Sequence, residues 1–175
     1  MLELKKLTFD LVSPEYVLGM NNPELLKFTG ARTKEWDIDS IKKYILDNQL
    51  SDNSILLGIF LDSVHCGNIR LHSLDTFNDA CEIGILIFLP SVWNKGIATE
   101  SIKKALKFAN ENLGVTRITA DYFEENLASS RVFAKCGFIY EGLFLRHFKN
   151  SDGSYSNSVR VAFNFSERID HGRKG

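Results

Sequence analysis

The stretch "PSVWNKGIATE", residues 90–100, joins an apolar segment to the start of an amphipathic one. The first N–H groups of a helix have no partners within it, and the helix dipole places about half a positive charge there. Gly96 lets a ligand approach the main chain closely, small Ala98 keeps the first turn open, and Lys95 adds a cation. The stretch therefore favours a site for an anion such as a pyrophosphate, with an ordinary strand-to-helix turn as the alternative.

The segment before this loop, "EIGILIFLP", is apolar on both faces up to Pro90. We expect it to form a strand that runs parallel to "ITADYF", residues 118–123, and to splay away from it near Pro90. Unpaired main chain in such a gap could hydrogen-bond an extended ligand that carries amide groups. A pantetheine arm has such amides, with a pyrophosphate at its far end.

The remaining patterns predict an α+β fold with a mixed, mostly antiparallel sheet and helices on both faces. Three apolar runs with short turns between them predict an antiparallel meander over residues 54–62, 65–75 and 81–89. The patterns favour further strands over residues 2–9, 115–123, 141–150 and 155–165. Apolar residues at helical spacing predict helices over 13–28 (interrupted at Pro23), 37–49, 96–113 and 126–137.

The composition is that of one ordinary globular domain. Hydrophobic residues make up 44% of the 175 residues, charged residues 25%, and the formal net charge is −1, so no strong field favours nucleic acid or an anionic membrane. We expect a single domain over residues 1–168, a frayed tail over 169–175, and a cytoplasmic protein without a membrane span or signal peptide. The three cysteines are expected to be buried reduced thiols, and no metal site is expected.

Two motifs in this order resemble the GNAT N-acetyltransferase superfamily. "WNKGIATESI", residues 93–102, is similar to its acetyl-CoA pyrophosphate loop, and "ENLASSRVFAKCGFIYEG", residues 125–142, to its later signature. Both have the form typical of the ribosomal-protein serine/alanine acetyltransferase group, in which a Trp takes the first loop position. The first helices also suit related amino-sugar acetyltransferases. The resemblance extends from about Gly67 to Phe163 and implies the GNAT fold, splayed at the centre of its sheet.

The resemblance also implies the cofactor, acetyl-CoA, and the residues that hold it. The main chain of three strand residues would pair with pantetheine, five loop and helix residues would hold the pyrophosphate through their amides, and Asn126 would contact the pantetheine arm. In order, the strand and loop residues are Ile85, Leu86, Ile87, Lys95, Gly96, Ile97, Ala98 and Thr99. Ser129 matches a serine placed near the thioester sulfur.

The implied reaction is direct attack of an amine on the thioester. Because an alkylamine of pKa about 10.4 is mostly protonated at neutral pH, a base would help. Glu82, a carboxylate in an apolar strand, is the leading candidate, and Asp121 and Tyr122 are alternatives. Many superfamily members carry a Tyr acid where this chain has Phe133, which leaves Ser129, a weak donor, or stabilisation of the thiolate by the helix N-terminus.

The acceptor amine stays open between a protein N-terminus and a small molecule such as an amino-sugar nucleotide. Acidic side chains (Glu82, Asp75, Asp79, Glu124) would suit the former, and basic ones (Arg32, Arg70, Arg146, His147) an acidic acceptor. We expect the turn "DTFNDA", residues 75–80, the first helices and the last hairpin to frame the acceptor mouth. A catalytically poor acyl-CoA sensor or scaffold is the alternative function, and a homodimer through the sheet edge or the last hairpin is compatible with the sequence.

Overall fold

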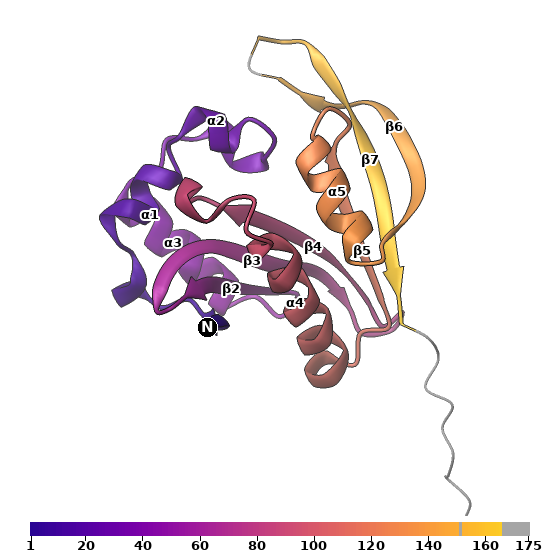
Figure 1. Cartoon of the computed structure of the whole chain (residues 1–175), viewed down its shortest axis with the longest axis horizontal. Helices are drawn as coiled ribbons and strands as arrows, with labels where there is room; N and C mark the ends of the chain where they lie inside the picture. The colour runs from indigo at the N-terminus through magenta and orange to yellow at the C-terminus, as the bar shows by residue number, and fades with distance from the viewer. Residues whose placement is uncertain (151, 166–175) are drawn as a thin grey trace, which may run out of the picture.

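The computed structural model describes residues 1–150 and 152–165, which form one seven-stranded sheet in the order β1-β2-β3-β4-β5-β7-β6 (Figure 1). The strands are β1 Leu2–Lys6, β2 Ser54–Leu61, β3 Val64–Asp75, β4 Ala80–Ile87, β5 Arg117–Phe123, β6 Ile139–Lys149 and β7 Tyr155–Asn164. All neighbours pair antiparallel except β4 and β5, which are parallel. The expected mixed, mostly antiparallel sheet is confirmed, whereas the tail expected over 169–175 and the boundary at 168 lie outside the described residues.

Helices cover the two faces of the sheet. The longer ones are α3 Ile38–Gln49, α4 Ile97–Leu113 and α5 Leu127–Lys135; the short ones are α1 Pro14–Gly19, α2 Pro23–Leu26 and the 3₁₀ turns η1 Phe9–Leu11, η2 Gly30–Thr33 and η3 Pro90–Val92. The residues of β2 alternate between two cores, because successive side chains of a strand face opposite ways. Leu56 and Phe60 pack with α1 and α3, whereas Ile59 packs in the core that includes α4 and α5.

Local sequence signals explain where the helices begin and end. Asp37 caps α3 in a capping box with Ser40. α4 ends at Gly114, which has a φ of 71°, and the turn after α5 passes through Gly137, with a φ of 87°. The interruption expected before Pro23 is confirmed by the separation of α1 from α2.

The structure differs from the sequence-based expectation in several places. β1 ends at Lys6 rather than Phe9, because Phe9 begins the 3₁₀ turn η1. β4 ends at Ile87 rather than Leu89, because the N–H groups of Phe88 and Leu89 both donate to the Cys66 carbonyl and so break the regular ladder. The turn over residues 76–79 does not frame the acceptor mouth. It precedes β4 and lies beside the start of β5, where the Thr116 and Arg117 N–H groups donate to the Asp79 carbonyl.

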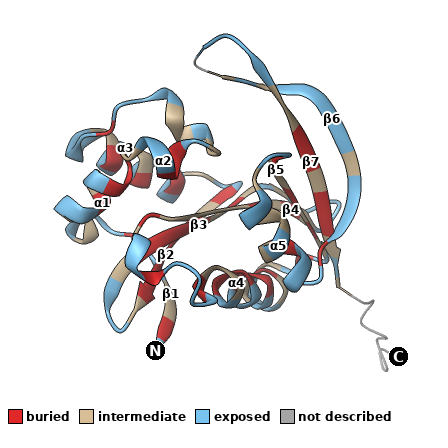
Figure 2. Cartoon of the chain, turned by 45° about the horizontal axis from the view of Figure 1, so that its top comes forward, coloured by how far each residue is buried: buried red, intermediate tan, exposed pale blue. Residues whose placement is uncertain are grey.

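The burial pattern and the cysteines complete the description of the fold. β6, at the edge of the sheet, is exposed along most of its length, whereas its neighbour β7 is buried or partly buried except at its two ends (Figure 2). All three cysteines are buried and free, as expected. Among the described residues no helix is long and apolar enough to cross a membrane, and no three metal-ligating side chains lie together.

Candidate active site

The parallel strands β4 and β5 pair over only a short stretch and then separate. The paired residues are Ala80 with Arg117, Cys81 with Ile118 and Glu82 with Thr119. Beyond this last pair, β4 continues to Ile87 and β5 to Phe123 without pairing to each other. The splay expected at the centre of the sheet is therefore present, and it begins well before Pro90. We call this region the fork.

The loop after β4 leads to a helix start that no side chain caps. Gly96 is the N-cap of α4 in the left-handed region, with a φ of 79°, and a Cβ added to it would meet nothing within 4 Å. In the described part of the chain, no side chain accepts a hydrogen bond from the N–H groups of residues 95–99. These unpaired donors, the helix dipole and the exposed Lys95 make the α4 N-terminus suited to an anion.

The loop and helix residues expected to hold the pyrophosphate lie together at this helix start. Ile97 contributes only main chain to the surface, since its side chain is 8% exposed and belongs to the core. Ala98 and Thr99 are partly exposed in the first turn. The Thr99 carbonyl faces α5, where the Cys136 Sγ lies 3.5 Å from it.

The strand residues expected to pair with pantetheine form one wall of the fork. Ile85, Leu86 and Ile87 are partly exposed although they are apolar, because they pair with β3 but β5 does not pair with β4 there. One feature was not expected from the sequence: the indole N–H of Trp93 donates to the Ile87 carbonyl at 3.1 Å. That carbonyl is therefore already engaged. The Leu86 carbonyl lies against Gly67 of β3, so Ile85 is the one of the three residues whose main chain is left to face the fork.

Helix α5 begins at the open end of the fork, directly after β5. Asn126 is its N-cap, and the Asn126 Oδ1 accepts a hydrogen bond from the Ser129 N–H at 3.1 Å. The sequence-based role of Asn126 as a ligand contact stays a prediction, and its local role is to cap this helix. Ser129 is partly exposed in the first turn. Phe133, one turn further, is 3% exposed and packs in the core.

Glu82 lies at the closed end of the fork, within a group of charged side chains. It is partly exposed and stands opposite His72 of β3. Burial lowers the pKa of His72, against the opposite effect of the Glu82 charge. Asp121, an alternative base, is instead tied to Arg160 of β7 by two hydrogen bonds of 2.9 and 2.5 Å, which raise the pKa of that guanidinium. Glu82 is therefore the freer carboxylate.

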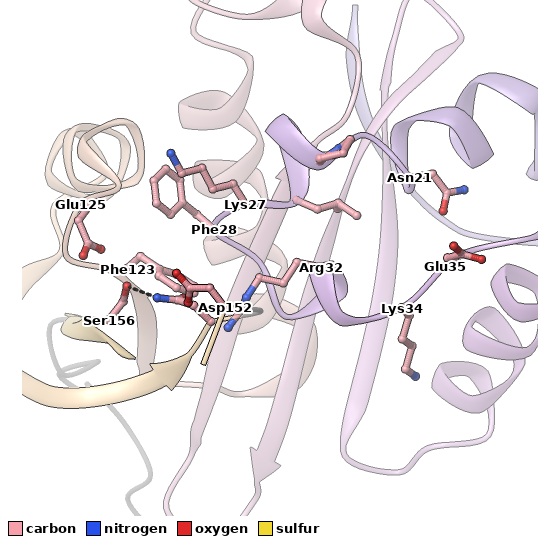
Figure 3. Close-up of a pocket in the computed structure, with 13 residues that line it drawn as sticks. Asn21, Lys27, Phe28, Arg32, Lys34, Glu35, Phe123, Glu125, Asp152 and Ser156 are labelled. Carbon is pink, nitrogen blue, oxygen red and sulfur yellow. Dashed lines mark hydrogen bonds between the residues drawn. The ribbon is translucent and has the colours of Figure 1, made fainter. Parts of the chain in front are cut away.

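A cavity of about 620 Å³ lies between the first helices and the far ends of β5 and the β6–β7 hairpin (Figure 3). Phe123, at the end of β5, lines it and packs against Phe28 with 5.6 Å between ring centroids. Charged side chains of both signs surround these rings; they are Lys27, Arg32, Lys34, Glu35, Glu125 and Asp152. The first helices and the last hairpin thus frame this cavity, and its role as the acceptor mouth stays a prediction.

The charges expected to select the acceptor are arranged differently from the prediction. Asp75 and Asp79 lie at the closed end of the fork with the β3–β4 turn, away from the cavity. Arg32 donates to the Lys149 carbonyl at 2.9 Å and stacks on Phe123, 4.8 Å from the ring centroid. It holds the two sides of the cavity together, a role that its sequence neighbours do not reveal.

Comparisons with known proteins agree with this architecture. The acetyltransferase (GNAT) domain family matches residues 2–139. "Uncharacterized N-acetyltransferase YoaA" of Bacillus subtilis is 34% identical over 93 residues, 53% of this chain and 52% of that protein. "Putative ribosomal N-acetyltransferase YdaF" of the same species is 35% identical over 107 residues, 61% of this chain and 55% of that protein. The chain thus spans a little over half the length of these relatives.

A solved structure shares the fold over nearly the whole chain. RimL, described as a ribosomal L7/L12 alpha-N-protein acetyltransferase in complex with coenzyme A, superposes with a TM-score of 0.85 at 18% identity, covering 94% of each chain. The fork, the uncapped helix and the family match lead to one assignment. The chain belongs to the GNAT family of acetyltransferases.

Proposed function

We propose that this chain transfers an acetyl group from acetyl-CoA to a primary amine, either a protein N-terminus or a small molecule. The observation that carries the proposal is the coincidence of two features at one place. β4 and β5 separate after the Glu82–Thr119 pair, and the loop after β4 ends in a helix N-terminus without a side-chain cap. A strand with one unpaired edge next to a cluster of free N–H donors suits a ligand that carries both amides and phosphates.

The residues present fit such a cosubstrate. The N–H groups from Lys95 to Thr99 would hold the diphosphate, because no side chain of the described residues competes for them and a Cβ at Gly96 would face open space. The main chain of Ile85, which faces the fork, would bond a pantetheine amide, whereas the Leu86 carbonyl lies against β3. The amide N–H₂ of Asn126 has no hydrogen-bond partner among residues 1–150 and 152–165, so it stays available to the same arm.

Within this proposal, the amine nitrogen attacks the thioester carbon, and the resulting surplus proton has to leave. Glu82 would accept it, directly or through a water, because its carboxylate lies at the fork and has no ion-pair partner in the described part of the chain. Ser129, in the first turn of α5, would lie near the sulfur of the thioester. The positive end of the α5 dipole would also stabilise the departing thiolate.

The acceptor would enter through the cavity at Phe123 and reach the thioester along the face that carries Glu82. Every second residue of β5 points to this face: Thr119, which pairs with Glu82, then Asp121 and Phe123. This row of side chains connects the fork with the cavity. The spermidine N-acetyltransferase of Vibrio cholerae and RimL share this fold at 20% and 18% identity, and they differ in acceptor. Both acceptor classes therefore stay within the proposal.

The remaining parts of the proposal concern assembly and location. The edge strand β6 exposes the apolar residues Ile139, Leu143 and Leu145, which a second copy could cover in a homodimer. Burial raises the pKa of the Cys66, Cys81 and Cys136 thiols, so they resist oxidation, in keeping with a cytoplasmic enzyme.

The test is to incubate the protein with acetyl-CoA and a panel of amines: peptides with different N-termini, polyamines and amino-sugar nucleotides. We expect coenzyme A release with at least one acceptor class and no release from a Gly96→Glu variant, which fills the helix entrance with a carboxylate. Tight coenzyme A binding without turnover across the panel would instead favour a sensor. Absence of binding would contradict the proposal altogether.

A further inference from the structure

The side of the sheet that carries α4 and α5 holds a hydroxyl group to which the proposed reaction assigns no role. Tyr122 belongs to β5, three residues beyond Thr119, the last residue paired with β4. At about 3.3 Å per residue, its Cα lies roughly 10 Å along β5 from the closed end of the fork. It therefore stands on the wall opposite Ile85 and Leu86, in the stretch where β5 has no pairing to β4.

The Tyr122 ring is fixed by packing whereas its hydroxyl is not. The ring stacks on Phe133 of α5, with 5.9 Å between centroids and 14° between planes, and is partly buried against the core. The hydroxyl makes no hydrogen bond to any residue in the described part of the chain. Buried tyrosines usually find a partner for this group; Tyr16, fully buried, accepts a hydrogen bond from Asn68. Because the Tyr122 ring is held in place and its hydroxyl is unused, this hydroxyl is suited to donate a hydrogen bond to a ligand in the fork.

Side-chain alternation places Tyr122 and Glu82 on opposite faces of the sheet. Glu82 pairs with Thr119, so it shares a face with Thr119 and Asp121, whereas Tyr122 follows Asp121 directly and faces the other way. A thioester held between β4 and β5 is open to both faces. The amine would thus approach from the side of Glu82, and a hydrogen donor would reach the sulfur from the side of Tyr122.

We propose that Tyr122 is the catalytic residue that donates hydrogen to the sulfur of coenzyme A as the thioester breaks. This inference rests on the proposed acetyl transfer. The nitrogen–carbon bond forms, the carbon–sulfur bond breaks, and the electron pair stays on sulfur. The phenol hydrogen then passes to sulfur, and solvent reprotonates the phenolate, while Glu82 takes the surplus proton of the amine. Ser129 is the competing donor, and an aliphatic hydroxyl is a much weaker acid than a phenol.

The test uses coenzyme A itself, so it does not require an acceptor. A thiolate that accepts a hydrogen bond becomes easier to form, so in the wild-type protein the bound thiol should ionise at least one pH unit below coenzyme A free in the same buffer. This ionisation is followed by the ultraviolet absorbance of the thiolate. The Tyr122→Phe variant should bind coenzyme A and desulfo-coenzyme A as tightly as the wild type, with its thiol titration back near the free value. Tyr140→Phe is the matched control, since Tyr140 is 65% exposed on β6.

Turnover gives the second readout. Once an acceptor is known, Tyr122→Phe should lower kcat by about 100-fold or more with little change in the affinity for acetyl-CoA. An unchanged thiol titration in Tyr122→Phe, or a loss found in Ser129→Ala but not in Tyr122→Phe, would overturn the inference. Loss of coenzyme A binding or of the folded state in Tyr122→Phe would also overturn it, because Tyr122 would then be a packing residue. If the wild type binds coenzyme A but acetylates nothing, the proposed function fails while the titration still decides the role of Tyr122.

Discussion

Replacing Gly96 by alanine separates its conformational role from a role in binding, because the chain supplies a matched control at the other end of the same helix. Gly96 precedes α4 with a φ of 79°, and Gly114 follows it with a φ of 71°. A Cβ built at either position meets nothing within 4 Å. Alanine therefore introduces backbone strain at both positions and a steric clash at neither.

The two substitutions should destabilise the protein equally. Holding an alanine in the left-handed region costs about 1–2 kcal/mol. For a chain of this size, that corresponds to a fall in Tm of roughly 2–8 °C. Only Gly96→Ala should weaken acetyl-CoA, because its methyl group would occupy the space that a diphosphate needs to reach the first N–H groups. Loss of one hydrogen bond to a charged group costs about 1.5–3 kcal/mol, which is a rise in Kd of about 10- to 150-fold.

The assay is calorimetric titration of acetyl-CoA into the wild type and both variants, with Tm measured in parallel. Equal affinity of Gly96→Ala and Gly114→Ala for acetyl-CoA would refute the assignment of the helix entrance, whatever the change in Tm. A much larger fall in Tm for one variant than for the other would show that the two positions do not carry comparable strain.

Three further substitutions probe the base, the cavity and the buried thiols. Glu82→Gln should lower kcat by about 100- to 10,000-fold at unchanged acetyl-CoA affinity, with the deficit shrinking as rising pH deprotonates the amine; normal turnover at neutral pH would remove Glu82 from the mechanism. Arg32→Lys should raise the KM for the acceptor several-fold without altering acetyl-CoA binding, since lysine loses the planar stack on Phe123; an unchanged KM would show that this link is dispensable. Burial raises the pKa of Cys81 from about 9 to about 11, so the stability it confers is present at low pH and lost as pH rises through this window. Unfolding of Cys81→Ala should accordingly depend less on pH between 9 and 11, and identical pH dependence in both proteins would contradict this.

Local sequence signals predicted most of the fold because each element carries its own boundary chemistry. The Asp37 cap, the break at Pro23 and the left-handed glycines at 114 and 137 act through bonds to residues a few positions away. The same holds for the place of the loop at Gly96, which the glycine marks, but not for its positive φ, because N-cap residues are normally extended, as Asp37 is with a φ of −108°. Such features can be inferred from the chain without knowledge of what packs on them.

The composition of the cavity could not be inferred in this way, since its residues meet across long separations. Arg32 bonds the main chain of Lys149, 117 positions away, and the ring on which it stacks is that of Phe123. From the sequence alone, we expected Arg32 to be one of the cations that bind an acidic acceptor. Its guanidinium keeps its positive charge, but it is held in place by the Lys149 carbonyl and the Phe123 ring, so it joins the two walls instead of standing free.

The position of the β3–β4 turn, which differs from the prediction, shows how the parallel pairing of β4 with β5 decides which loops can reach a site. If β4 and β5 were antiparallel, the loop before β4 would lie beside the end of β5, and Asp75 and Asp79 could face the acceptor. The three residue pairs between β4 and β5 are parallel, so the loops that precede these two strands meet at the closed end of the fork. The loops that follow the strands, at Pro90 and Glu124, meet at the open end. Any acidic recognition of the amine therefore has to come from residues after β5 or in the first helices, such as Glu125 and Glu35. Removing the Asp75 carboxylate should consequently leave the acceptor KM unchanged.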